Sequence, residues 1–205
     1  MSFSNEYFDK EFANVPVMGI FRSLGLERSI ELCTIAWDSG VESVEVPVMS
    51  QDDLDVLSAV VAAGRERGKD VGAGTIVSPE LVDAVAAAGA KFTVAPGFDL
   101  DVVERCAAIG MPHLPGIATS SEIQRALRAD LNWLKAFPAS NLGPSWIKNQ
   151  SGPFPTVNFV ATGGVTSQNA EQFLDAGCRV VALGSAFAKE SEITEVGRII
   201  ASRRA

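Results

Sequence analysis

The chain has 205 residues, which is enough to bury a full core and is the size of one ordinary domain. Its 47% hydrophobic and 20% charged residues are typical of a globular protein. The net charge of −8 argues against a general nucleic-acid binder or a protein that binds anionic membranes, although a local pocket can still be positive.

The residue types that usually carry metal or triad chemistry are scarce. Three widely spaced cysteines form no Cys-x-x-Cys pair, and the single histidine, His113, is more simply a packed or hydrogen-bonded side chain. We therefore expect no metal site and no cofactor, and acid–base chemistry is left to lysine and glutamate. No leader opens the chain and no apolar run could cross a bilayer, so a cytoplasmic protein is expected.

Apolar runs and helical patterns alternate along the chain. Tyr7, Phe8 and Phe12 fall at helical spacing and predict a short helix within residues 1–14. Ser78-Pro79 and Thr119-Ser120-Ser121-Glu122 carry the signals of helix starts. The predicted strands are 15–21, 43–48, 70–76, 91–95, 111–114, 132–138, 157–161 and 179–183. The predicted helices that follow them are 26–39, 52–67, 79–88, 100–109, one from 119, 143–149, 167–176 and 192–203.

This is a strand followed by a helix eight times, without a linker-like segment. The strands are continuous apolar runs, as expected when both faces of a parallel sheet are covered. We predict an α/β fold, a (β/α)8 TIM barrel, in a single domain of residues 1–205. A doubly wound open sheet is the competitor, but the first strand–helix turn lacks Gly-x-Gly-x-x-Gly.

In such a barrel the functional residues lie at the C-terminal ends of the strands. Those ends carry Arg22, Glu45 with Pro47, Thr75, Pro96, Lys135 with Phe137, Thr162-Gly163-Gly164 and Gly184-Ser185. The polar residues therefore gather at one face of an otherwise apolar core.

Lys135 stands in the apolar run Asn132-Trp133-Leu134-Lys135-Ala136-Phe137-Pro138. A neutral lysine amine attacks carbonyls to form a Schiff base, whereas a structural lysine would extend its ammonium to the strand end. Glu45 lies on the second predicted strand, opposite the sixth, so the two side chains can meet inside the ring. The alternative interpretation is a buried ion pair that contributes only to structure.

Glycines end the seventh and eighth predicted strands, at Gly163, Gly164 and Gly184, and Ser185 adds a hydroxyl. In this architecture these two loops often hold a phosphate with backbone N–H groups and a helix N-terminus. The alternative is that the glycines only form tight turns.

At this point the chain resembles the family of 2-keto-3-deoxy-6-phosphogluconate (KDPG) and 4-hydroxy-2-oxoglutarate (KHG) aldolases, which are class I, metal-independent lyases. The matching stretches follow the order of the family: Val44-Glu45-Val46-Pro47, Gly72-Ala73-Gly74-Thr75, Pro115-Gly116, Leu134-Lys135-Ala136-Phe137-Pro138, Gly152-Pro153, Thr162-Gly163-Gly164 and Gly184-Ser185.

The resemblance implies cleavage of KDPG to pyruvate and glyceraldehyde 3-phosphate, with Lys135 as the Schiff-base lysine and Glu45 as the general acid/base. It implies that the phosphate lies on the loops around Gly163, Gly164, Gly184 and Ser185, and that the enzyme is a homotrimer. The remaining substrate contacts expected from the strand ends are Arg22, Thr75, Pro96, Phe137 and Thr162, with Arg22 and Thr75 on the carboxylate.

The substrate is less clearly implied than the reaction. Met49 stands where gluconate-type members often carry arginine, and Glu45-Val46-Pro47 and Leu142-Gly143-Pro144 are more similar to the 6-phosphogalactonate members. Thr162 is similar to the gluconate type. The same chemistry on 2-keto-3-deoxy-6-phosphogalactonate or on 4-hydroxy-2-oxoglutarate is the first alternative. A phosphosugar epimerase or isomerase, or a non-catalytic phosphosugar-binding barrel, is the second.

Overall fold

The computed structural model describes residues 2–203, with the side chain of residue 190 left aside. Residues 1, 204 and 205 of the predicted 1–205 domain lie outside the described residues. The strands are β1 (Val17–Ile20), β2 (Val44–Pro47), β3 (Val71–Gly74), β4 (Phe92–Val94), β5 (His113–Leu114), β6 (Gly116–Ile117), β7 (Trp133–Ala136), β8 (Asn158–Ala161) and β9 (Val180–Leu183).

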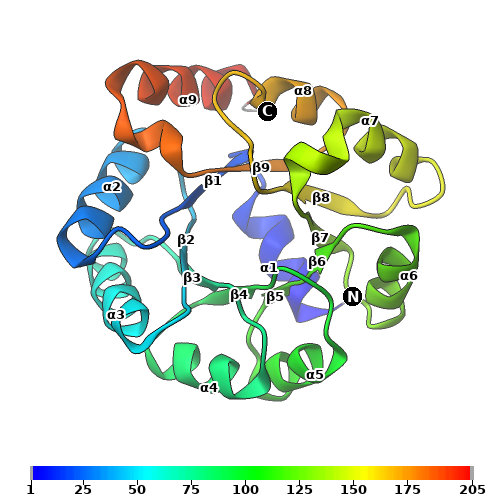
Figure 1. The fold of residues 1–205 in the computed structure, drawn as a ribbon, viewed down its shortest axis with the longest axis horizontal. Helices are drawn as coiled ribbons and strands as arrows, with labels where there is room; N and C mark the ends of the chain where they lie inside the picture. Colours follow the sequence, from blue (N-terminus) through cyan, green and yellow to red (C-terminus); the bar gives the residue numbers. More distant parts are fainter. Residues whose placement is uncertain (1, 204–205) are drawn as a thin grey trace.

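The strands form a nearly closed parallel barrel, which confirms the predicted fold class. Their order is β5-β4-β3-β2-β1-β9-β8-β7-β6, and every pair in it is parallel. Figure 1 shows the ring of strands surrounded by the helices. The gap in the ladder falls between β5 and β6, which only Pro115 separates along the chain.

The fifth barrel strand is therefore split, whereas the sequence predicted one short strand ending at Leu114. Pro115 has no N–H and cannot continue the ladder as a donor, but its carbonyl accepts from Lys135 N at 2.9 Å. Gly116 then approaches the neighbouring chain closely: a Cβ built on it would lie 2.2 Å from the carbonyl oxygen of Pro96. Glycine at this position lets the second half of the strand turn toward β7.

The described helices follow the strands in the predicted order. They are α1 (Phe3–Glu11), α2 (Leu26–Asp38), α3 (Gln51–Glu66), α4 (Pro79–Ala87), α5 (Leu100–Ile109), α6 (Ser120–Arg128), α7 (Ala139–Ser151), α8 (Ala170–Asp175), the 3₁₀ helix η1 (Ser185–Ala188) and α9 (Glu190–Arg203). Ser50, Ser78 and Thr119 cap α3, α4 and α6 with their side chains, and Thr119 forms the predicted capping box with Glu122.

Two helix boundaries differ from the prediction. Helix α7 includes an additional turn from Ala139 ahead of the helix expected at 143–149. Gly143 (φ 77°, ψ 163°) is a non-helical kink between the two segments, so the second segment begins where the sequence predicted it. Helix α8 spans six residues instead of the expected 167–176, since Thr166 to Asn169 form a turn in which Thr166 N donates to Asn169 Oδ1 at 2.8 Å.

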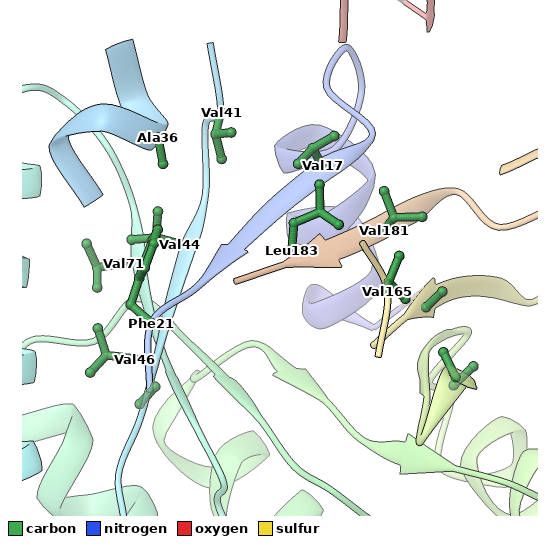
Figure 2. Close-up of a cluster of buried hydrophobic side chains, with 14 of the residues drawn as sticks. Val17, Phe21, Ala36, Val41, Val44, Val46, Val71, Val165, Val181 and Leu183 are labelled. Atoms are coloured by element: carbon green, nitrogen blue, oxygen red, sulfur yellow. The ribbon is translucent and has the colours of Figure 1, made fainter. Parts of the chain in front are cut away.

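Two apolar layers hold the fold together. The outer layer packs the helices against the barrel, and Figure 2 shows part of it, with Val44 and Val71 beside Phe21. The inner layer fills the barrel with strand side chains such as Phe92 and Trp133.

Helix α1 contributes Phe8 and Phe12 to the inner layer and closes the N-terminal end of the barrel (Figure 1). Trp133 Nε1 donates to Asp9 Oδ1 at 2.9 Å, and Tyr7 OH donates to Asp70 Oδ2 at 2.8 Å. The opposite, C-terminal end is left for a site. Among the described residues, no helix combines the length and apolar character needed to span a membrane.

Candidate active site

A cavity of about 570 Å³ opens at the C-terminal ends of β1, β2, β7, β8 and β9. It contains nine of the predicted site residues: Arg22, Glu45, Lys135, Phe137, Thr162, Gly163, Gly164, Gly184 and Ser185.

Lys135 points into this cavity from β7. Trp133, two residues earlier, packs in the inner layer, and side chains two apart on a strand share a face, so Lys135 also faces inward. The side chain is buried, and Nζ lies 5.0 Å from the centroid of the Phe137 ring. A lysine with apolar and aromatic neighbours and access to a cavity is suited to attack a carbonyl.

Glu45 meets Lys135 from the opposite side of the barrel. It is fully buried, and its Oε1 lies 4.0 Å from Lys135 Nζ. Neither carboxylate oxygen has a hydrogen-bond partner among the described residues. Burial raises the pKa of the Glu45 carboxyl, and the nearby charges of Lys135 and Arg22 lower it in part. A carboxyl whose pKa is raised binds a proton more readily, which suits a group that exchanges protons with a ligand.

Arg22 follows β1 and borders the mouth of the cavity, with its side chain exposed. Its charge acts on Glu45, so the guanidinium is close enough to influence the buried pair. An exposed guanidinium beside a cavity is a suitable partner for a carboxylate or phosphate group.

The glycine loops after β8 and β9 form another wall. Gly163 and Gly164 have φ values of 90° and 75°, which favour glycine, and Ser140 N donates to Gly163 O at 2.9 Å. A Cβ built on Gly184 would lie 2.7 Å from the carbonyl oxygen of Ile20. The glycines thus permit backbone conformations and close approaches at the cavity, beyond what a simple turn requires.

Thr162 lines the cavity and directly precedes the glycine pair after β8. The residue is buried, and Oγ1 has no hydrogen-bond partner among the described residues. Buried hydroxyls are normally paired, so this oxygen has a hydrogen-bonding capacity that the described residues leave unused.

Two predicted site residues lie outside this cavity's lining. Thr75, at φ 65°, borders a separate hollow of about 360 Å³ together with Met49. Pro96 packs its carbonyl against Gly116 instead. Both follow the ends of their strands, where the loop conformation decides the direction of the chain.

The sequence reasoning also missed part of the wall, namely Ile20, Leu24, Leu32, Val165, Thr166, Ala182 and Ala188. Ile20 and Ala182 continue the inward-facing alternation of β1 and β9, so strand periodicity could have found them. Leu24 lies on the β1–α2 loop, and no pattern in the sequence indicates its direction. In the described part of the chain, no three His, Cys, Asp or Glu side chains are grouped as metal ligands.

Comparison with known proteins identifies relatives of this site and fold. The sequence model of the family described as "KDPG and KHG aldolase" matches residues 8–201. The chain is 36% identical over 172 residues to the 2-dehydro-3-deoxy-6-phosphogalactonate aldolase of Escherichia coli strain K12, covering 83% of each. It is 35% identical over 176 residues to the 2-dehydro-3-deoxy-phosphogluconate aldolase of Treponema pallidum, covering 84% of this chain and 80% of the relative.

Among solved structures, the chain is similar to KDPG aldolase from Legionella pneumophila "with pyruvate captured at low pH as a covalent carbinolamine intermediate". The TM-score is 0.82 at 26% identity, with 100% of this chain and 99% of the other covered. The similarity therefore extends over the whole barrel, including both strands that carry Lys135 and Glu45.

Proposed function

The chain belongs to the family of KDPG and KHG aldolases and is an aldolase, and on that premise we propose that it cleaves KDPG through a Schiff base on Lys135. The products are pyruvate and glyceraldehyde 3-phosphate. We also propose that residues 1–205 form one domain that performs this reaction.

The observation that carries the proposal is the buried pair of Lys135 and Glu45, whose Nζ and Oε1 lie 4.0 Å apart in a cavity at the catalytic end of the barrel. A structural ion pair would be expected to satisfy its carboxylate oxygens, whereas both oxygens of Glu45 lack hydrogen-bond partners among the described residues. The carbinolamine captured in the Legionella relative is the kind of adduct that an amine forms with pyruvate, and it supports the same chemistry here.

The first half of the proposed mechanism breaks the carbon–carbon bond. The neutral Lys135 amine attacks the C2 carbonyl to form a carbinolamine, and loss of water gives an iminium ion. Glu45, directly or through water, removes the proton of the C4 hydroxyl. The C3–C4 electron pair then moves toward the iminium nitrogen, which leaves an enamine and releases C4 as the aldehyde carbon.

The second half releases pyruvate. Protonated Glu45 returns its proton to C3 of the enamine, which regenerates an iminium ion. Water adds to C2, and collapse of the carbinolamine frees pyruvate and the Lys135 amine. The raised pKa of Glu45 suits a group that alternates between base and acid within one cycle.

The two charged ends of the substrate are assigned to different groups at the mouth of the cavity. We assign the phosphate to the loops of Gly163, Gly164 and Gly184 with Ser185, where positive φ values and close backbone approaches support the assignment. We assign the carboxylate to Arg22, and we expect Phe137 to form the apolar side of the site.

Thr75 and Pro96 remain predicted substrate contacts, although they lie outside the cavity's lining. Met49, which borders the hollow beside Thr75, offers no charge to a substrate. The carboxylate therefore depends mainly on Arg22.

The second candidate is the same reaction on 2-keto-3-deoxy-6-phosphogalactonate, which the name of the Escherichia coli relative favours. The two substrates differ at the C4 hydroxyl, and the unpaired Thr162 hydroxyl is available to distinguish them. Steady-state rates on both epimers and on 4-hydroxy-2-oxoglutarate, at one enzyme concentration, would rank the three substrates.

Trapping with borohydride tests the Schiff base directly. Incubation with pyruvate and borohydride should add the mass of a reduced pyruvyl group to the peptide that contains Lys135, and to no other lysine peptide. An adduct on another residue, or none, would contradict the mechanism.

The matched variant is Lys135→Met, which keeps the apolar stem and removes the amine. Pyruvate release, measured with lactate dehydrogenase, should fall to near the uncatalysed rate because the variant can form no imine. An epimerase or isomerase that uses only the phosphate site would keep its activity in this variant.

We further propose that the enzyme works as a homotrimer in the cytoplasm, as the family resemblance implies. Light scattering after size-exclusion chromatography would give the mass of the assembly. A monomer or dimer at micromolar concentration would contradict the trimer.

A further inference from the structure

Gly74, the last residue of β3, lies directly against the Glu45 carboxylate. A Cβ built on Gly74 would lie 1.8 Å from Glu45 Oε1 and 2.6 Å from its carboxyl carbon. Gly74 is not among the positive-φ glycines, so the backbone conformation does not require a glycine here. The neighbouring carboxylate requires it instead, because any side chain would occupy the same space.

The carboxylate has few other constraints. Neither oxygen accepts a hydrogen bond from the described residues, and the 4.0 Å to Lys135 Nζ is longer than a hydrogen bond. The orientation of Glu45 therefore depends on packing, with Gly74 against Oε1 and the lysine across the cavity. A residue that fixes a reacting group by contact can matter as much as one that donates to it.

We propose that Gly74 is a positioning residue for Glu45: its bare backbone lets the carboxylate lie toward Lys135, with neither oxygen held by a hydrogen bond from the described residues. This inference rests on the proposed role of Glu45 in the aldol cleavage. A hydrogen-bond donor in the same place would hold one oxygen and favour the charged form, which would hinder a group that must also carry a proton.

Gly72 provides a matched control on the same strand. It is two residues earlier and faces the same side, and a Cβ built on it would lie 2.2 Å from the Phe92 ring. Gly72 thus makes room for an aromatic side chain of the inner layer, not for a group of the cavity. Crowding at Gly72 should disturb packing without acting through Glu45.

The test compares Gly74→Ala and Gly72→Ala in the wild-type and Glu45→Gln backgrounds, measured by pyruvate release. In wild type, Gly74→Ala should lower kcat by about 100-fold, the loss expected from displacing a catalytic group by about 1 Å, with little change in KM. In the Glu45→Gln background it should add little further loss, because no catalytic carboxyl remains to be displaced. Gly72→Ala should change kcat by the same factor in both backgrounds.

Equal losses from Gly74→Ala in both backgrounds, or an unchanged kcat in wild type, would overturn the inference. One side of the pH profile of kcat/KM should disappear in Glu45→Gln, and the apparent pKa of that same side should shift in Gly74→Ala. An unshifted apparent pKa in Gly74→Ala would contradict the inference.

A second measurement applies if Gly74→Ala folds poorly. Adding Glu45→Ala removes the clashing atoms, so the Tm of the double variant should exceed that of Gly74→Ala; no recovery would contradict the steric contact. Borohydride trapping in the wild type separates the two proposals. A missing Lys135 adduct refutes the Schiff base, whereas the Tm comparison still decides whether Gly74 accommodates Glu45.

Discussion

Thr162 buries a hydroxyl that has no hydrogen-bond partner among the described residues. Leaving such a group unpaired costs about 1–3 kcal/mol of folding free energy. Thr162 lines the cavity, and under the proposed function a substrate hydroxyl completes the missing bond. Stability and activity should therefore respond in opposite directions when this oxygen is removed.

Thr162→Val tests this at nearly constant shape. We expect the free energy of unfolding in urea to rise by about 1 kcal/mol, because the unpaired oxygen is gone. We expect kcat/KM to fall by about 10-fold on the substrate epimer that uses the bond, and less on the other.

Thr93→Val is the contrasting control for that variant. The Thr93 hydroxyl is buried but shares a hydrogen bond with His113 Nδ1 at 2.9 Å, and neither residue lines the cavity. The Thr93→Val variant should have a lower free energy of unfolding and an unchanged kcat/KM. A destabilised Thr162→Val with unchanged kinetics would show that Thr162 has only a structural role.

Much of the site was predictable residue by residue. Lys135 and Glu45 could be paired from the sequence because side-chain alternation and opposite positions in an eight-membered ring are simple geometric rules. Thr75 could not be placed by such rules, since its φ of 65° turns the chain after β3 and is rare for a β-branched residue. Gly74 stood out in the sequence only as part of Gly72-Ala73-Gly74-Thr75, one of the stretches that resemble the family.

At the scale of elements, helix starts were predictable because capping is local. Thr119 and Glu122 form a reciprocal capping box at the start of α6, with Glu122 Oε2 accepting from Thr119 N at 2.9 Å. Helix ends and strand interruptions were less predictable. The first turn of α7 lies against the end of β8, where Ala139 N donates to Thr162 O at 2.7 Å, and the split of the fifth barrel strand depends on how Gly116 approaches Pro96.

Thr119→Ala should lower the free energy of unfolding by about 1 kcal/mol, because the backbone N–H of Glu122 in the first turn of α6 loses the Thr119 hydroxyl as its acceptor. Urea denaturation measures this change. Ser121→Ala, at an exposed position of the same helix, is the control and should change it by less than about 0.5 kcal/mol. Equal effects of the two substitutions would mean that the capping box contributes nothing.

At the scale of the molecule, the barrel depends on a closed N-terminal end. Helix α1 plugs that end with Phe8 and Phe12, and Ser4 Oγ accepts from His113 N at 3.2 Å. His113 is buried there, and burial lowers the pKa of its imidazole to about 4. The predicted structural role of His113 agrees with these contacts.

The acid stability of the protein should reflect His113. The unfolded chain binds a proton at His113 below a pH of about 6.5, whereas the folded chain does so only near pH 4. The contribution of His113 to the free energy of unfolding is therefore fully present above pH 6.5. About 3 kcal/mol of the free energy of unfolding is lost as the pH falls from 6.5 to 4.

Urea unfolding of wild type and His113→Gln across this range measures the difference in slope. Other titrating groups are common to both proteins, so they cancel to first order. The variant should start less stable at pH 7 and lose less on acidification. Parallel curves would show that His113 is not the acid-sensitive group.

The sequence by itself determined the order of strands and helices and the barrel, and it led to the proposal of lysine and glutamate as the reacting groups. These follow from periodicity, capping and alternation, which act over a few residues. Only the tertiary structure decided that Glu45 Oε1 and Lys135 Nζ lie 4.0 Å apart, that Gly74 makes room for the carboxylate, and that Thr75 turns toward a separate hollow. Those features arise where segments distant in sequence pack together, and packing distances are not encoded in any local pattern.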